Sequence, residues 1–122
     1  MKLRVLLAED HAMFRAALRM TLQSAPDIEV VGEAEDGQQA LASLDHVVPD
    51  IVCMDINMPV MDGIEATRRL LEIHPHVKVI GLSAHDDPVP IEALIKAGAV
   101  GYVIKSDAGT QLLTAIRLAA GR

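Results

Sequence analysis

Residues 50–55 read Asp50-Ile-Val-Cys-Met-Asp55, an uninterrupted apolar run with an acid at each end. A short apolar run without alternation is typical of a strand that is covered on both faces. Strands of this kind belong to parallel sheets between two layers of helices. The stretch therefore predicts a central strand, Ile51–Met54, with Asp55 at its carboxyl end.

Other apolar runs of strand length recur at the spacing of a strand–helix unit on both sides of this one. They are Leu3–Ala8, Glu29–Ala34, Val77–Leu82 and Val100–Ile104. Helix signals fill the segments between them, because apolar residues recur at helical spacing and acidic capping boxes precede the helical runs. The expected helices are His11–Ala25, one from Asp36, one from Asp62 to His74, one from Pro88 to Gly98, and Asp107–Ala120.

This alternation predicts an α/β fold of the (βα)₅ type. Right-handed crossovers restrict such a chain to a doubly wound, five-stranded parallel sheet. A length of 122 residues suits a single domain, residues 1–122.

The composition excludes several classes of function. A net charge of −6 argues against contact of this segment with nucleic acid or an anionic membrane. No run approaches the roughly 20 apolar residues of a membrane span, so we expect a cytoplasmic protein. Cys53 is the only cysteine, which excludes an internal disulfide and a cysteine-based zinc site. Its apolar setting predicts a buried thiol.

Side chains able to do chemistry follow the predicted strands at their carboxyl ends, where doubly wound sheets bind ligands. Glu9 and Asp10 follow the first strand and Asp55 follows the third. Three neighbouring carboxylates repel one another, and Mg²⁺, which prefers oxygen ligands, relieves that repulsion. We expect Asp10 and Asp55 to bind Mg²⁺ directly and Glu9 to act through water. The alternative is that Glu9 and Asp10 only cap the following helix.

Ser83 ends the fourth strand and Lys105 ends the fifth. A metal, a lysine and a hydroxyl around one carboxylate suit a phosphoryl group, and Asp55 is then the nucleophile that forms an acyl phosphate. The chain has no phosphate-binding loop of the Gly-x-x-x-x-Gly-Lys-Ser/Thr type, so the phosphoryl donor must come from another molecule. Alternatively, Lys105 is a solvated surface charge and Ser83 a plain turn residue.

Taken together, these motifs resemble the receiver domain of two-component response regulators over the whole chain. The matching motifs are Glu9-Asp10, Asp55-Ile-Asn-Met-Pro59, Met61-Asp62-Gly63, Ser83-Ala84-His85 and Gly101-Tyr102-Val-Ile-Lys105. Four short segments of sequence resemble the subfamily whose members carry a LuxR-type helix-turn-helix output domain. They are Glu9–Arg15, Asp62–Arg68, Leu82–His85 and Ala97–Tyr102.

The resemblance implies a flavodoxin-like sheet of order 2-1-3-4-5 and a phosphorylation-dependent signalling switch that regulates transcription. It implies that Asp55 accepts phosphoryl from the phosphohistidine of a histidine kinase. Mg²⁺ would be bound by Asp10, Asp55 and the backbone carbonyl of Asn57, with Glu9 in support through water. Such a domain assists its own phosphorylation and dephosphorylation but is not a turnover enzyme.

The resemblance also implies how the signal spreads. Lys105 would pair with the phosphorylated aspartate, Ser83 would follow the new phosphoryl oxygen, and Tyr102 would change rotamer. The change would reach the face of the fourth helix, fifth strand and fifth helix, and control a homodimer or a DNA-binding output domain. Asn57 and His85 would tune the lifetime of the phosphate. The alternatives are a Tyr102 that merely packs at the sheet edge and a solvated His85.

Two other classes of function compete with the switch. A Mg²⁺-dependent phosphohydrolase of the haloacid dehalogenase type needs a second aspartate two positions after the first, where this chain has Asn57, and a cap for which there is no room. A degenerate binding module would not need the acids, Ser83 and Lys105. The chain ends at Arg122, where a linker is expected, so we expect either an excised receiver or a stand-alone one.

Overall fold

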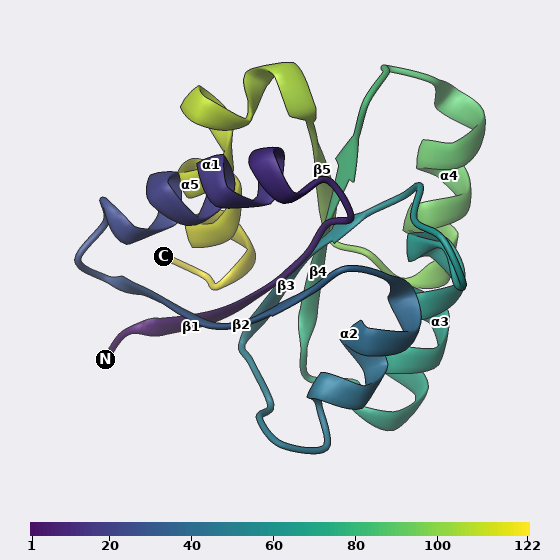
Figure 1. The fold of residues 1–122 in the computed structure, drawn as a ribbon, viewed down its shortest axis with the longest axis horizontal. Coiled ribbons are helices and arrows are strands. Elements are labelled where there is room, and N and C mark those ends of the chain that lie inside the picture. Colours follow the sequence, from purple (N-terminus) through teal and green to yellow (C-terminus); the bar gives the residue numbers. More distant parts are fainter.

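The computed structural model describes residues 1–122 as one parallel sheet between two layers of helices (Figure 1). The strand order is β2-β1-β3-β4-β5, and every neighbouring pair is parallel. The predicted doubly wound (βα)₅ fold with order 2-1-3-4-5 is therefore confirmed. The strands are β1 (Leu3–Ala8), β2 (Ile28–Ala34), β3 (Ile51–Asp55), β4 (Lys78–Ser83) and β5 (Gly101–Ile104).

The helices lie where the sequence predicts them. Helices α1 and α5 cover one face of the sheet, and α2, α3 and α4 cover the other (Figure 1). Their ends differ from the prediction by one or two residues, because His11 keeps an extended backbone and a 3₁₀ turn precedes the last helix. The helices are α1 (Ala12–Gln23), α2 (Gly37–Ser43), α3 (Gly63–Ile73), α4 (Pro88–Ala97) and α5 (Ala108–Ala119), with the 3₁₀ turn η1 (Lys105–Asp107).

Acidic caps begin three of these helices. Asp36 accepts a hydrogen bond from the amide of Gln39 at 2.8 Å, and Asp62 accepts one from the amide of Glu65 at 2.8 Å. Asp87 accepts a hydrogen bond from the amide of Val89 at the start of α4. These bonds satisfy amides that have no partner within the helix, which is why the acids mark the helix starts.

The side chains of the central strands alternate between two separate cores. In β3, Ile51 and Cys53 face α1 and α5, whereas Val52 and Met54 face the opposite layer. Cys53 is fully buried, and burial raises the pKa of its thiol to about 12, so the predicted buried thiol is confirmed. The same alternation directs Asp55, the next residue in line with Cys53, toward the α1 and α5 side.

A close backbone approach fixes the end of β3. The amide of Gly63 donates to the carbonyl of Ile56 at 2.8 Å, and a Cβ at position 63 would lie 1.9 Å from the carbonyl oxygen of Asp55. Helix α3 thus begins directly against the strand end that carries Asp55. None of the helices is both long and apolar enough to cross a membrane.

Candidate functional site

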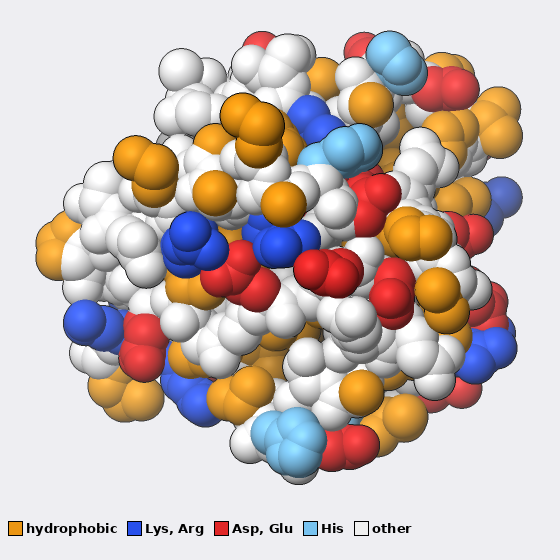
Figure 2. Space-filling view, in the orientation of Figure 1, with side chains coloured by type: hydrophobic (Ala, Val, Ile, Leu, Met, Phe, Trp, Pro, Cys, Tyr) orange, Lys and Arg blue, Asp and Glu red, His pale blue; other side chains and the backbone are white.

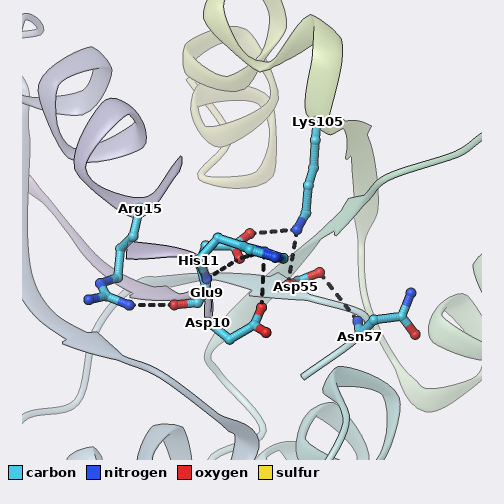
Figure 3. Close-up of polar contacts among 7 residues, drawn as sticks. All are labelled: Glu9, Asp10, His11, Arg15, Asp55, Asn57 and Lys105. Carbon is cyan, nitrogen blue, oxygen red and sulfur yellow. Dashed lines mark hydrogen bonds and ion pairs between the residues drawn. The ribbon is translucent and has the colours of Figure 1, made fainter. Parts of the chain in front are cut away.

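Four side chains that can bind a metal meet at the carboxyl edge of the sheet. One ligand atom from each of Glu9, Asp10, His11 and Asp55 lies within 4.8 Å of the others (Figure 3). The first three follow β1, and Asp55 ends the adjacent β3, so strand pairing itself brings them together. Glu9 is fully buried and Asp55 is 2% exposed. The predicted convergence of the three carboxylates is present.

Lys105 reaches the same cluster from the start of η1. Its Nζ lies 2.6 Å from Glu9 Oε1 and 3.0 Å from Asp55 Oδ2 (Figure 3). The ammonium group also lies 5.3 Å from the centroid of the Phe14 ring, within the range of a cation–π contact. Lys105 is therefore no solvated surface charge. The sequence analysis does not predict this contact with Phe14.

Glu9 makes two different contacts, and one of them is the helix cap that the sequence suggested as an alternative. Its Oε1 faces Lys105, and its Oε2 accepts a hydrogen bond from the amide of His11 at 2.9 Å. The second contact caps the first turn of α1, whose N-cap residue His11 makes no side-chain cap of its own. One buried carboxylate thus joins the helix start to the cluster.

The electrostatics of the cluster leave a deficit of positive charge. Burial raises the pKa of Asp55 to about 7, and the negative charge of Glu9 adds to the rise, although Lys105 opposes it. Burial also acts to raise the pKa of Asp10, but hydrogen bonding with Asp55 and Glu9 outweighs it and the net shift is downward. One lysine faces three carboxylates, so the cluster favours a further cation.

One carboxylate oxygen of Asp10 indicates whether a cation fits the cluster. Asp10 Oδ1 is buried and accepts no hydrogen bond, and its one ion-pair contact is the exposed imidazole of His11 at 3.4 Å. A buried acceptor without a donor is costly unless an ion or water satisfies it. A carboxylate oxygen of this kind beside a second carboxylate matches the hard oxygen ligands that Mg²⁺ prefers. The residues present therefore fit a magnesium ion.

The loop after β3 carries Asn57 past the cluster. The amide of Asn57 donates to Asp55 Oδ1 at 3.3 Å, and its side chain is exposed. Further along, the amide of Met61 donates to the carbonyl of Pro59 at 2.7 Å, and Val60 between them has a φ of 69°. This is a γ-turn with positive φ, a strained conformation for a β-branched residue.

Ser83 and Tyr102 lie apart from the contacts of Lys105. Ser83 is buried, and its hydroxyl donates to the carbonyl of His85 at 2.5 Å instead of to the cluster. Because Leu82 faces α1 and α5, the alternation turns the next side chain toward the opposite layer. Tyr102 is 41% exposed on β5 and makes no side-chain hydrogen bond, and His85 is exposed in the loop before α4.

Comparison with known proteins supplies the family. Residues 5–117 match the family model described as the response regulator receiver domain. The chain belongs to this family. The receiver domain is 39% identical over 119 residues to the transcriptional regulatory protein DegU of Brevibacillus brevis, a match that covers 98% of this chain and 50% of that protein. It is 39% identical over 117 residues to LiaR of Bacillus subtilis (strain 168), covering 96% of this chain and 56% of that protein.

The receiver domain thus spans about half the length of the curated relatives it matches. Among solved structures it resembles a LuxR-family two-component response regulator from Aurantimonas sp. SI85-9A1, with a TM-score of 0.93 and 33% identity over 100% of this chain and 88% of that one. It also resembles the receiver domain of NarL from Mycobacterium tuberculosis, with a TM-score of 0.90, 32% identity and coverage of 99% and 98%. The predicted family and its LuxR-type subfamily are confirmed.

One side chain beside the site had no predicted role. Arg15 of α1 donates through Nη1 to the backbone carbonyl of Glu9 at 2.7 Å. It lies in the stretch Glu9–Arg15 that carries the subfamily resemblance, but nothing in that stretch indicates a contact with the backbone. The available indication in the sequence was that Arg15 falls in the first turns of the helix that follows β1, close to the strand end that carries Glu9.

Proposed function

We propose that this receiver domain is a phosphorylation-dependent signalling switch in which Asp55 accepts a phosphoryl group. The observation that carries the proposal is the position of Asp55. It ends a central strand, is 2% exposed, and lies 3.0 Å from the ammonium of Lys105 beside the carboxylates of Glu9 and Asp10. We further propose that residues 1–122 act as one such domain.

The metal in this proposal is Mg²⁺. Asp10, Asp55 and the backbone carbonyl of Asn57 would hold it, with Glu9 in support through water. The unpartnered Asp10 Oδ1 and the raised pKa of Asp55 support this assignment, because a cation favours the ionised carboxylates. When bound, Mg²⁺ neutralises charge on the transferring phosphoryl oxygens.

The donor in this proposal is the phosphohistidine of a histidine kinase. A carboxylate oxygen of Asp55 attacks the phosphorus, a P–O bond forms, and the P–N bond breaks with its electron pair going to the imidazole. Lys105 offsets negative charge on the acceptor side of the transfer. The product is an acyl phosphate on Asp55, and the domain undergoes the change once per phosphorylation, which is the behaviour of a switch and not of a turnover enzyme.

Ser83 and Tyr102 are the proposed switch residues. The Ser83 hydroxyl would leave the carbonyl of His85 for a phosphoryl oxygen, and Tyr102 would leave its exposed position on β5. Asn57 and His85 would border the water path and set the lifetime of the phosphate. The altered face of α4, β5 and α5 would then control a second copy of the chain or a DNA-binding output region, since relatives of about twice the length are named transcriptional regulators.

Intact mass spectrometry tests the proposal. The protein is incubated with acetyl phosphate, with and without Mg²⁺, as wild type, Asp55→Asn and Asp50→Asn. The control, Asp50, lies directly before β3 at the opposite end of the same strand. We expect a gain of about 80 Da that requires Mg²⁺, is lost in Asp55→Asn and persists in Asp50→Asn. A full gain in Asp55→Asn would contradict the proposal.

A further inference from the structure

Arg15 connects helix α1 to the backbone of the metal site. Its Nη1 donates to the carbonyl oxygen of Glu9 at 2.7 Å (Figure 3), and its Nε donates to Glu33 Oε1 of β2 at 3.0 Å. The Arg15 side chain is 14% exposed. A guanidinium held at two points in a partly buried setting has little freedom, so the Glu9 carbonyl meets a donor that is already in place.

The bonded carbonyl belongs to the peptide unit that joins Glu9 to Asp10. A peptide unit is planar, so fixing its carbonyl also fixes the direction in which the chain enters Asp10. The amide of Glu9 donates to the carbonyl of Ala34 at 3.0 Å. Glu9 is therefore held from both sides, by β2 through its amide and by Arg15 through its carbonyl.

Beyond the neighbouring carboxyl groups of Asp55 and Glu9, Asp10 has few other constraints. Its Oδ1 accepts no hydrogen bond, and its nearest ion-pair partner is the exposed imidazole of His11, at 3.4 Å. The direction of this carboxylate thus depends on the backbone that carries it. Rotation of the peptide before Asp10 would turn the carboxylate away from Asp55.

We propose that Arg15 is a positioning residue for the cation site, and that it holds the Glu9–Asp10 peptide so that both carboxylates converge with Asp55. The inference rests on the proposed function, because it assumes that the cation is Mg²⁺. Groups that orient metal ligands without touching the metal commonly change metal affinity by one to two orders of magnitude.

The competing explanation is that Arg15 only ties α1 to β2 through Glu33 and to Glu35, whose Oε1 lies 3.7 Å from Arg15 Nη2. Arg19, one turn further along α1, provides a matched control. Its Nη1 lies 2.8 Å from the other oxygen of Glu33, Oε2, but it does not contact Glu9. The two arginines and Glu33 border one polar hollow between α1 and β2, and Figure 2 shows basic and acidic side chains next to one another across this face of the molecule.

The test compares Arg15→Met with Arg19→Met. The dissociation constant for Mg²⁺ is measured by isothermal titration calorimetry, and folding is checked by urea unfolding without metal. We expect Arg15→Met to bind Mg²⁺ about tenfold more weakly and Arg19→Met to bind it as wild type does. Backbone ¹⁵N relaxation adds a signature of positioning, since the order parameter of the Asp10 amide should fall only in the Arg15 variant.

Two results would overturn the inference. One is equal Mg²⁺ affinity in Arg15→Met and wild type, and the other is an equal loss in both arginine variants. If the wild type itself binds no Mg²⁺, both the proposed metal site and the inference fail. If the wild type binds Mg²⁺ and Arg15→Met binds it equally well, only the inference fails. Arg15→Lys covers the case in which Arg15→Met does not fold, because one ammonium cannot reproduce the two-point contact and an intermediate loss of affinity is expected.

Discussion

The ammonium group of Lys105 lies 2.6 Å from the carboxylate of Glu9, which is fully buried. This contact joins the start of η1 to the end of β1. Lys105 is the only lysine or arginine that pairs with the carboxylate of Glu9, whose other oxygen faces the exposed imidazole of His11. A buried carboxylate is tolerated when its charge is paired, and removal of one partner of such a pair is strongly destabilising.

Replacing Lys105 should therefore cost stability even though the side chain is long and partly accessible. We expect Lys105→Met to lower the free energy of unfolding by about 3 kcal/mol at neutral pH without metal. Urea unfolding followed by circular dichroism measures the loss. Lys96→Met, a change at an exposed position in the last turn of α4, serves as the control and should stay near wild type. A loss no larger than that of the control would show that the ion pair contributes little.

Asp55 gives the protein a predictable dependence on pH. Its folded pKa of about 7 exceeds the ordinary value of 3.8, so between these values the folded state holds a proton that the unfolded state releases. Stability from this group is therefore complete below the unfolded pKa and is lost as the pH rises through about 7. Asp55→Asn removes this titration. The free energy of unfolding of the variant should therefore exceed that of the wild type by an amount that grows as the pH rises from 3.8 to about 7 and then levels off.

Urea unfolding of the wild type and Asp55→Asn over a pH series without Mg²⁺ checks this expectation. Excess Mg²⁺ should reduce the advantage of Asp55→Asn at high pH, since a cation compensates the ionised carboxylate of the wild type. A constant difference at every pH would contradict the raised pKa of Asp55.

Val60 stores strain in the loop after the candidate phosphorylation site. Its φ of 69° is unfavourable for a β-branched residue, and its side chain is 80% exposed, so packing does not compensate. Val60→Gly should raise the free energy of unfolding by about 1 kcal/mol, because relief of strain exceeds the added flexibility of glycine. The matched change Val48→Gly, in a loop without positive φ, should lower it by about 0.5 kcal/mol. Equal effects of the two substitutions would exclude strain at Val60.

Replacement of glycine by alanine should change the stability of the protein in opposite directions at positions 63 and 109. A Cβ at position 63 would meet the carbonyl oxygen of Asp55 at 1.9 Å, whereas a Cβ at position 109 meets nothing within 4 Å. Gly63→Ala should lower stability by about 3 kcal/mol or more and weaken Mg²⁺ binding, because α3 must move away from Asp55. Gly109→Ala in α5 should raise stability by about 0.5 kcal/mol. Thermal unfolding of both variants suffices, and a Gly63→Ala protein as stable as wild type would contradict the close approach.

The fold could be predicted from the sequence because its signals are local. The apolar run before Asp55, the acidic caps at Asp36 and Asp62, and the glycine at position 98, which has a φ of 118°, each specify an element without reference to the rest of the chain. Parallel pairing then brings the strand ends to one edge. The convergence of Asp55 with the acids after β1 follows from these steps alone.

The finer contacts of the site could not be predicted because they depend on rotamers and on residues distant in sequence. The Phe14 ring near Lys105, and the guanidinium of Arg15 on a backbone carbonyl, are set by how α1 packs on the sheet. The direction of the Ser83 hydroxyl depends on the path of the following loop, which places the His85 carbonyl within its reach. Sequence patterns identify the residue type at such positions but not the partner that it meets.

Tyr102 is the only tyrosine of a chain that contains no tryptophan. Because its ring is exposed on β5 beside the side chains of Ala115 and Leu118, ultraviolet emission excited near the tyrosine absorption band comes from this one surface and from no other part of the molecule. Every change in the emission of the isolated protein, whether from Mg²⁺ or a small phosphoryl donor, therefore reports the environment of a single side chain. The protein carries its own fluorescent probe, and no label is needed to follow this face in real time.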